Sequence, residues 1–231
     1  MLTVESFHAG FEHYKNLLQT DVDLPEVPGF SPHALRLLLN TIPKMLPHTN
    51  YLEVGTFYGA SLAATLHKNE NTNLRALAID SLTDMQGKRF GLIINNKSPL
   101  VSVTVDVNFQ RQWINKVIAT VGSGNATFWE LDVLKMQAAK VANFFPEGVN
   151  LFFYDGDHSY HATFESLICL LPCCSDRCIL VMDDLHFDLV EQATKDAITL
   201  GGWEVLADHR VFGHENAWIF SVQLLQRKSN A

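Results

Sequence analysis

The sequence predicts an α/β protein of the doubly wound type, built on a seven-stranded sheet. From residue 50 onward, short apolar runs alternate with helical segments, which is typical of a parallel sheet with helices on both faces. Five of these runs end in an acidic residue. A short loop separates the last two runs, and such a loop allows only an antiparallel hairpin, here at the edge of the sheet.

Two helices are expected before the first strand. Apolar spacing predicts a helix over residues 4–20, followed by a break that is rich in proline. Ser31 and Pro32 read as the N-cap and the first residue of a second helix, which should stop near Pro43 or Pro47.

Strands and helices then follow in turn. The runs expected as strands are 51–54, 74–79, 126–131, 149–154, 178–182, 203–211 and 217–225. The expected helices are 59–68, 109–121, 133–145, 160–171 and 189–200. Residues 81–106 read as an irregular loop insertion, and Gly213 lies in the turn between the last two strands.

Residues 50–61 combine the end of a buried strand, a tight turn and the start of a helix. Glu53 lies at the strand end, and Gly55 and Gly59 follow with the spacing G-x-x-x-G. Glycine lets the backbone approach a ligand closely because it has no Cβ. The spacing is not the dinucleotide fingerprint G-x-G-x-x-G, and the acid disfavours a phosphate. A ligand with a cationic amino group, a ribose and an adenine fits better.

Acidic residues stand at the ends of five predicted strands. The carboxyl ends of parallel strands share one edge of a sheet, and ligands bind just outside that edge. Helix capping could explain any one of these acids but explains the whole set poorly. The acids are Glu53, Asp80, Asp132, Asp155 and the pair Asp183 and Asp184.

These acids divide into two groups with different expected tasks. The Asp80 carboxylate can accept hydrogen bonds from both hydroxyls of a ribose, and Asp132 can accept one from an adenine amino group. In the segments 154–160 and 182–186, the carboxylates of Asp155, Asp183 and Asp184 converge from neighbouring strands with no lysine or arginine close in sequence. Such a cluster is costly unless a cation neutralises it, and carboxylate oxygens suit Mg²⁺, Mn²⁺ or Ca²⁺.

The glycine stretch resembles the first motif of class I S-adenosylmethionine (SAM) methyltransferases, especially the catechol and caffeoyl-CoA O-methyltransferase branch. The two acidic segments are similar to the metal site of cation-dependent O-methyltransferases, including the macrocin and mycinamicin sugar enzymes. The resemblance covers roughly residues 50–222 and is weak in residues 81–106.

The resemblance implies roles for individual residues. The metal ligands would be Asp155, Asp183 and Asp184; the catechol branch usually has asparagine at the last of these positions. His158 would be the general base, because the sugar enzymes have histidine there and imidazole titrates near neutral pH. A solvated loop histidine is the alternative. The implied donor-site residues are Glu53, Gly55, Thr56, Phe57, Gly59, Ser61, Asp80, Asp132, Asp155 and Asp157.

Two of these positions carry further alternatives. Ser61 matches the serine that related enzymes place against the SAM carboxylate, and a helix-surface serine is the alternative. His161 and His186 are expected to support the site from outside it. If either bound the metal directly, zinc or iron would be favoured over magnesium.

We therefore expect a Rossmann-like sheet of order 3-2-1-4-5-7-6 with strand 7 antiparallel. Residues 1–48 would form an N-terminal helical extension and residues 49–231 the methyltransferase domain. The expected reaction is SAM-dependent O-methylation of a small hydroxylated acceptor, either a sugar diol or a catechol-like molecule. The expected cofactors are SAM and a divalent cation, Mg²⁺ before Mn²⁺ or Ca²⁺.

Other functions stay open. A methyltransferase without a metal could use His158 alone, and a non-catalytic SAM- or nucleotide-binding module would keep the same fold. A nucleotide-dependent oxidoreductase or epimerase is disfavoured by the glycine spacing and by the missing Tyr-x-x-x-Lys pair at a plausible site.

Composition narrows the partners. The formal net charge of -8 disfavours a nucleic-acid surface, which needs clustered Lys and Arg. No apolar run approaches the ~20 residues of a membrane helix. The N-terminus does not read as a signal peptide, so a cytoplasmic protein is expected, with a homo-oligomer left open. Four cysteines within residues 169–178 read as reduced thiols that flank a strand, with a zinc site as the alternative.

Overall fold

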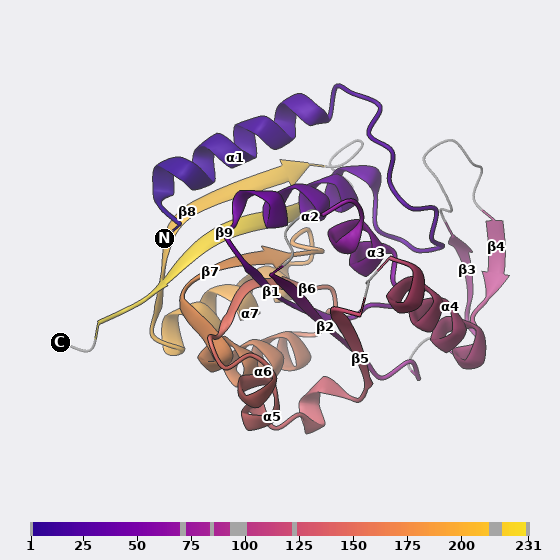
Figure 1. Cartoon of the computed structure of the whole chain (residues 1–231). Helices are drawn as coiled ribbons and strands as arrows, with labels where there is room; N and C mark the ends of the chain where they lie inside the picture. Colours follow the sequence, from indigo (N-terminus) through magenta and orange to yellow (C-terminus); the bar gives the residue numbers. More distant parts are fainter. Residues whose placement is uncertain are drawn as a thin grey trace.

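Seven strands form one sheet in the order β5-β2-β1-β6-β7-β9-β8 (Figure 1). The structure is a computed structural model that describes residues 2–69, 73–83, 86–92, 101–121, 124–212 and 219–229. β9 is antiparallel to both β7 and β8, and the first five strands of the order are parallel. The predicted order 3-2-1-4-5-7-6 and the antiparallel seventh strand are confirmed. The strands are β1 (Thr49–Val54), β2 (Leu74–Asp80), β5 (Ala126–Glu130), β6 (Val149–Tyr154), β7 (Cys174–Met182), β8 (Trp203–Phe212) and β9 (Ile219–Arg227).

Helices cover both faces of this sheet and form a separate core on each. α1 to α4 lie on one face and α5 to α7 on the other (Figure 1). Successive residues of β1 point to opposite cores, so Tyr51 packs in the first and Leu52 in the second. The helices are α1 (Val4–Leu17), α2 (His33–Met45), α3 (Ala60–Leu66), α4 (Val107–Thr120), α5 (Ala138–Phe144), α6 (Tyr160–Leu170) and α7 (Asp188–Leu200).

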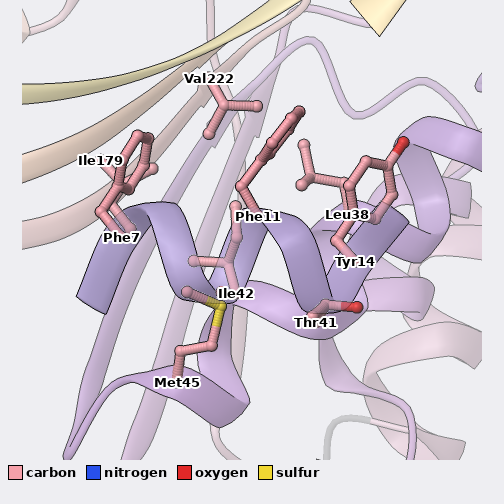
Figure 2. Close-up of a pocket in the computed structure, with 10 residues that line it drawn as sticks. Phe7, Phe11, Tyr14, Leu38, Thr41, Ile42, Met45, Ile179 and Val222 are labelled. Atoms are coloured by element: carbon pink, nitrogen blue, oxygen red, sulfur yellow. The ribbon is translucent and has the colours of Figure 1, made fainter. Parts of the chain in front are cut away.

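The two N-terminal helices share the first core with the sheet. Phe7 and Phe11 of α1 and Ile42 of α2 belong to it, although a domain boundary after residue 48 stays a prediction. Figure 2 shows these side chains around a cavity of about 10 Å³. That volume holds at most one water molecule. None of the predicted site residues lines it, so we interpret it as a packing gap.

Two segments differ from the predicted elements. The expected loop 81–106 contains an antiparallel hairpin of β3 (Arg89–Leu92) and β4 (Val101–Thr104). The expected helix 133–145 is interrupted: a 3₁₀ turn, Val133–Lys135, precedes α5. Met136 between them has an extended backbone and buries its side chain in the second core, which ends the first helical turn.

Two smaller predictions were also wrong. Pro32 has an extended ψ of 161° and is itself the N-cap of α2, so Ser31 is not the cap. All four cysteines are free, but Cys174 and Cys178 lie within β7 instead of flanking it. The predicted turn at Gly213 lies outside the described residues. In the described part of the chain, no helix has both the length and the apolar character needed to cross a bilayer.

Candidate active site

The parallel register brings the strand-end acids to one edge of the sheet. Val54 is level with Ile79 of β2 and with Tyr154 of β6. Tyr154 is level in turn with Met182 of β7. The next residues on these four strands are Gly55, Asp80, Asp155 and Asp183. They share the edge at which ligands bind in doubly wound sheets.

The loop after β1 runs directly against the end of β6. The Gly55 N–H donates to the Ile79 carbonyl at 2.9 Å, and the Asp155 N–H donates to the Val54 carbonyl at 2.9 Å. Gly55 has a φ of 87°, and a Cβ there would lie 1.8 Å from the Asp155 carbonyl oxygen. Only glycine fits this contact. Gly59, with a φ of 85°, is the N-cap of α3.

Asp80 fastens this loop to β2. Its Oδ2 accepts the Phe57 N–H at 2.8 Å, and its Oδ1 accepts the Leu82 N–H at 2.7 Å. Phe57 and Leu82 have positive φ angles of 50° and 58°, which are uncommon for residues other than glycine. Thr56, beside Phe57 in the loop, is buried. A carboxylate oxygen can accept more than one hydrogen bond, so such a group suits the hydroxyls of a ligand.

Glu53 is fully buried, and its carboxylate is bound inside the protein. The Tyr51 hydroxyl donates to Oε2 at 2.5 Å, and the Ser61 hydroxyl donates to Oε1 at 2.7 Å. Burial raises the pKa of Glu53 from 4.5 to about 6, although these two hydrogen bonds lower it. Glu53 thus ties β1 to the start of α3. The predicted contact between Ser61 and the donor carboxylate stays a prediction.

Replacing Glu53 with glutamine should stabilise the protein more at neutral pH than at acidic pH. Because the folded-state pKa is raised, the contribution of Glu53 to stability is full below pH 4.5 and is lost as the pH rises through about 6. The shift of the pKa from 4.5 to about 6 corresponds to about 2 kcal/mol of unfolding free energy. Urea unfolding of Glu53→Gln should show a gain of this size over wild type as the pH is raised to neutrality.

Glu130 provides the control for this pH dependence. It is an exposed acid whose pKa is lowered, first by its hydrogen bond with Arg111, so Glu130→Gln should show the opposite trend. A stability difference between Glu53→Gln and wild type that stays constant with pH would contradict the assignment.

The segment between α1 and α2 contributes to the same edge. At Gly29, a Cβ would lie 2.8 Å from the Cβ of Ala60, the first residue of α3. Phe30 stacks on Phe57 with ring centroids 4.9 Å apart and stays 38% exposed. Sequence reasoning missed Phe30 because no motif marks a contact between segments so far apart in the chain.

Asp155, His158 and Asp184 form a second group at this edge. Each offers a ligand atom, and these three atoms lie within 4.8 Å of one another. The pKa of Asp155 is raised well above its usual value, first by burial and then by the charges of Asp183 and Asp184. Asp184 has a φ of 56°, a left-handed turn directly after β7. Two carboxylates and an imidazole are a suitable donor set for a divalent cation.

His158 contacts both the Asp184 carboxylate and an aromatic ring. Its Nε2 is 2.6 Å from Oδ2 of Asp184, and this hydrogen bond raises the pKa of His158. Its ring stacks on Phe187, with centroids 5.0 Å apart. His186 also lies near Asp184, with its Nδ1 3.6 Å from Oδ1, and its ring packs against Phe187 with centroids 4.2 Å apart. Phe187 was not predicted from the sequence.

Asp183 is buried but is not part of that group of three. Its Oδ1 accepts the backbone N–H of Asp184 at 2.8 Å. Its charge still acts on the group, because it raises the pKa of both Asp155 and His158. The structure therefore brings His158 close to Asp155 and Asp184, and the direct ligand role of Asp183 stays a prediction.

Two other predicted acids have local tasks in the structure. Asp132 accepts the Leu134 N–H at 3.0 Å and caps the 3₁₀ turn after β5. Asp157 accepts the Ser159 N–H at 2.8 Å just before α6. The Asp132 contact agrees with the capping alternative, whereas the N-cap of α6 is Ser159 and not Asp157. The donor-binding roles of Asp132 and Asp157 stay predictions.

A comparison with known families identifies the family of the chain that carries this site. The family described as a methyltransferase domain matches residues 52–185, more than half of the chain. The chain belongs to this family. The predicted methyltransferase identity is therefore confirmed. The matched part of the methyltransferase contains every predicted site residue from Glu53 to Asp184, whereas Phe30 and Phe187 lie outside it.

Solved structures share the fold of this methyltransferase. An O-methyltransferase from Bacillus cereus in complex with SAH is 11% identical, with a TM-score of 0.58 over 98% of this chain and 93% of that one. The O-methyltransferase TomG from Streptomyces achromogenes, involved in tomaymycin synthesis and in complex with SAM, is 13% identical. Its TM-score is 0.56 over 99% of this chain and 92% of that one. No curated protein matches the sequence.

Proposed function

We propose that this methyltransferase transfers the methyl group of SAM to a hydroxyl oxygen of a small acceptor with two adjacent hydroxyls, assisted by a divalent cation. The observation that carries the proposal is the grouping of the strand-end acids at one edge of the sheet. There, the glycine loop after β1, which is bound to Asp80, lies against Asp155 and so adjoins His158 and Asp184. The O-methyltransferases of the same fold support it. A cytoplasmic location, and a small-molecule partner in place of nucleic acid or membrane, belong to the same proposal.

The donor would bind along the glycine loop. Gly55 and Gly59 leave the backbone open to close approach, and the Asp80 carboxylate would accept hydrogen bonds from the ribose hydroxyls. Ser61, Asp132 and Asp157 would contribute further polar contacts. SAM supplies an electrophilic methyl group on a positively charged sulfur, and its loss leaves S-adenosylhomocysteine (SAH).

The acid group fits a divalent cation. Repulsion from Asp183 and Asp184 adds to burial in raising the pKa of Asp155, and a cation held by these residues would relieve it. Carboxylate oxygens favour Mg²⁺, with Mn²⁺ and Ca²⁺ as alternatives, and His158, as the base, would not be a ligand of the ion. Such an ion, when bound, lowers the pKa of a coordinated acceptor hydroxyl.

His158 would act as the general base. Nε2 of the neutral imidazole donates to Asp184, so Nδ1 takes the proton of the acceptor hydroxyl, the oxygen forms a bond to the methyl carbon, and the bond from sulfur to that carbon breaks. The hydrogen bond with Asp184 raises the pKa of His158, so the neutral form prevails only above that raised pKa. The acceptor would be positioned for in-line attack, which supplies much of the rate acceleration.

A metal-independent methyltransferase is the second candidate function. The 2.6 Å contact between His158 and Asp184 favours it, because Asp184 would orient the imidazole and stabilise the imidazolium that forms. Turnover that survives chelator treatment would select this mechanism. SAH binding with no turnover on any diol would instead favour a non-catalytic binding module.

Calorimetric titration with SAH tests the donor site directly. Asp80→Ala should weaken SAH binding about 10-fold or more, because the variant loses a ligand contact and releases the Phe57 turn. Asp183→Ala should leave SAH affinity within a few-fold while abolishing turnover that depends on the cation. Asp80→Asn, which keeps one acceptor oxygen, controls for unfolding. A folded wild-type protein that binds no SAH would refute the proposal.

A further inference from the structure

Two histidines join α1 to β8, the strand at one edge of the sheet. Nδ1 of His8 lies 2.8 Å from Nε2 of His209, so one ring nitrogen donates a hydrogen bond to the other. The His209 ring also stacks on Phe11, with centroids 4.0 Å apart and an interplanar angle of 2°, and on Phe7, with centroids 5.5 Å apart. These three partners all belong to α1, so His209 is a point at which β8 holds this helix.

Other parts of the α1 interface are imperfectly packed. The cavity of about 10 Å³ in Figure 2 lies against α1 and is lined by Phe7, Phe11 and Tyr14. Tyr14 is buried, but its hydroxyl has no hydrogen-bond partner within the described part of the chain. A gap loses dispersion contacts, and a buried hydroxyl without a partner costs free energy. The docking of α1 should therefore have a small margin of stability, so the loss of one contact matters.

The hydrogen bond between the two histidines tolerates one added proton but not two. A neutral imidazole has one nitrogen that accepts, whereas an imidazolium has an N–H on both nitrogens and accepts nothing. When one ring is charged, it can still donate to the neutral one. When both rings are charged, the hydrogen bond is lost and two positive charges repel each other at the same contact. The contact between His8 and His209 therefore depends on pH.

The surroundings of His209 disfavour its charged form. Burial lowers the pKa of His209 below its ordinary value of 6.5, and the charge of His8 acts in the same direction. Lys15 adds to this lowering, whereas Asp208 and Glu12 oppose it, and Glu12 is itself bound by Lys15 at 2.7 Å. Because the folded-state pKa is lowered, the contribution of His209 to stability is full above 6.5 and is lost as the pH falls through the folded pKa.

The other elements around α1 bring few charges to this contact. β9 places the apolar Val222 level with His209. Glu5, in the first turn of α1, lies near both His8 and the positively charged Arg177 of β7. α2 faces the cavity beside α1 with four side chains that carry no charge: Leu38, Thr41, Ile42 and Met45.

We propose that His8 and His209 form a pH-sensitive latch, which holds α1 on β8 near neutral pH and releases the helix in acid, when both rings are positively charged. Release uncovers the face of α1 that carries Phe7 and Phe11 in the first core. The latch does not depend on methyl transfer, because neither histidine belongs to the predicted site.

Hydrogen–deuterium exchange of the full chain tests the latch, with rates corrected for the intrinsic pH dependence of exchange. From about pH 7.5 to about pH 5, the protection of the α1 amides in the wild type should fall about 10-fold or more, as expected when one hydrogen bond is replaced by repulsion. α7, in the core on the other face of the sheet, should keep its protection. His209→Phe keeps a flat ring against α1 but takes no proton, so its α1 protection should change less than about 3-fold.

His13 provides the matched control, because it is an exposed histidine of the same helix. His13→Asn should keep the fall in α1 protection that the wild type shows. His8→Ala changes an exposed residue and is the second test variant, with an expected response to pH as small as that of His209→Phe. Four outcomes would overturn the latch: constant α1 protection in the wild type, an equal fall in α7, a wild-type fall in either test variant, or a lost response in His13→Asn.

Discussion

The Asp155→Asn variant should be more stable than the wild-type protein without ligands, and it should be inactive. Asp155 is desolvated beside Asp183 and Asp184, and both effects disfavour its charged form. Asparagine has nearly the same shape but cannot ionise. Removing an uncompensated buried charge should stabilise the fold by roughly 1–3 kcal/mol. Methyl transfer should fall at least about 100-fold if Asp155 holds the cation that activates the acceptor.

This gain in stability should grow with pH. The folded-state pKa of Asp155 lies above its usual value of 3.8, so the contribution of Asp155 to stability is full below that value and is lost as the pH rises through the folded pKa. The variant escapes this loss. Thermal melts should therefore show similar stabilities in acid and a widening advantage for Asp155→Asn toward neutral pH.

Added Mg²⁺ or Mn²⁺ should reverse the ranking. A cation that binds only the folded wild type raises its Tm, whereas the variant has lost a ligand and should respond weakly. Asp176→Asn is the control, since Asp176 lies near the opposite end of β7 and its side chain is 93% exposed. Its stability should stay within about 0.5 kcal/mol of wild type. A destabilised Asp155→Asn, or one stabilised by Mg²⁺ as strongly as wild type, would contradict the cation site.

The sequence was informative wherever a local pattern determines the structure. Apolar runs predicted all seven strands of the sheet, and the acids at their ends correctly predicted that Asp80 and Asp155 share one edge. Met136 shows the limit of such patterns. Its helical neighbours predicted a continuous helix, but burial of its side chain in the second core required an extended backbone.

The details of the site depend on contacts that no local pattern contains. The left-handed turn at Asp184 accompanies a group that contains His158 and not Asp183, and spacing alone could not show this. Phe30 reaches the glycine loop from a segment before α2, where Gly29 packs against Ala60. Such long-range contacts form only when the whole fold assembles.

The Gly55→Ala variant should lose both stability and donor binding. Its new Cβ would lie 1.8 Å from the Asp155 carbonyl oxygen, at a φ of 87° that alanine adopts only with strain. The neighbouring backbone cannot move aside easily, because β1 and β6 are held together there by the hydrogen bond from Asp155 to Val54. We expect a loss of roughly 4 kcal/mol or more, measured by urea unfolding, and no calorimetric binding of SAH.

Variants at two other glycines are controls that show the effect of backbone strain without this clash. Gly87 has a φ of 75° with nothing within 4 Å of a new Cβ, so Gly87→Ala should cost about 1–2 kcal/mol from strain alone. Gly59 has a φ of 85° and an ordinary nearest contact of 3.6 Å with Val117, so Gly59→Ala should cost about as much. If Gly55→Ala were no worse than these two variants, the loop after β1 would not be seated on the end of β6. The acid group could not then adjoin the donor, and the arrangement on which methyl transfer depends would be lost.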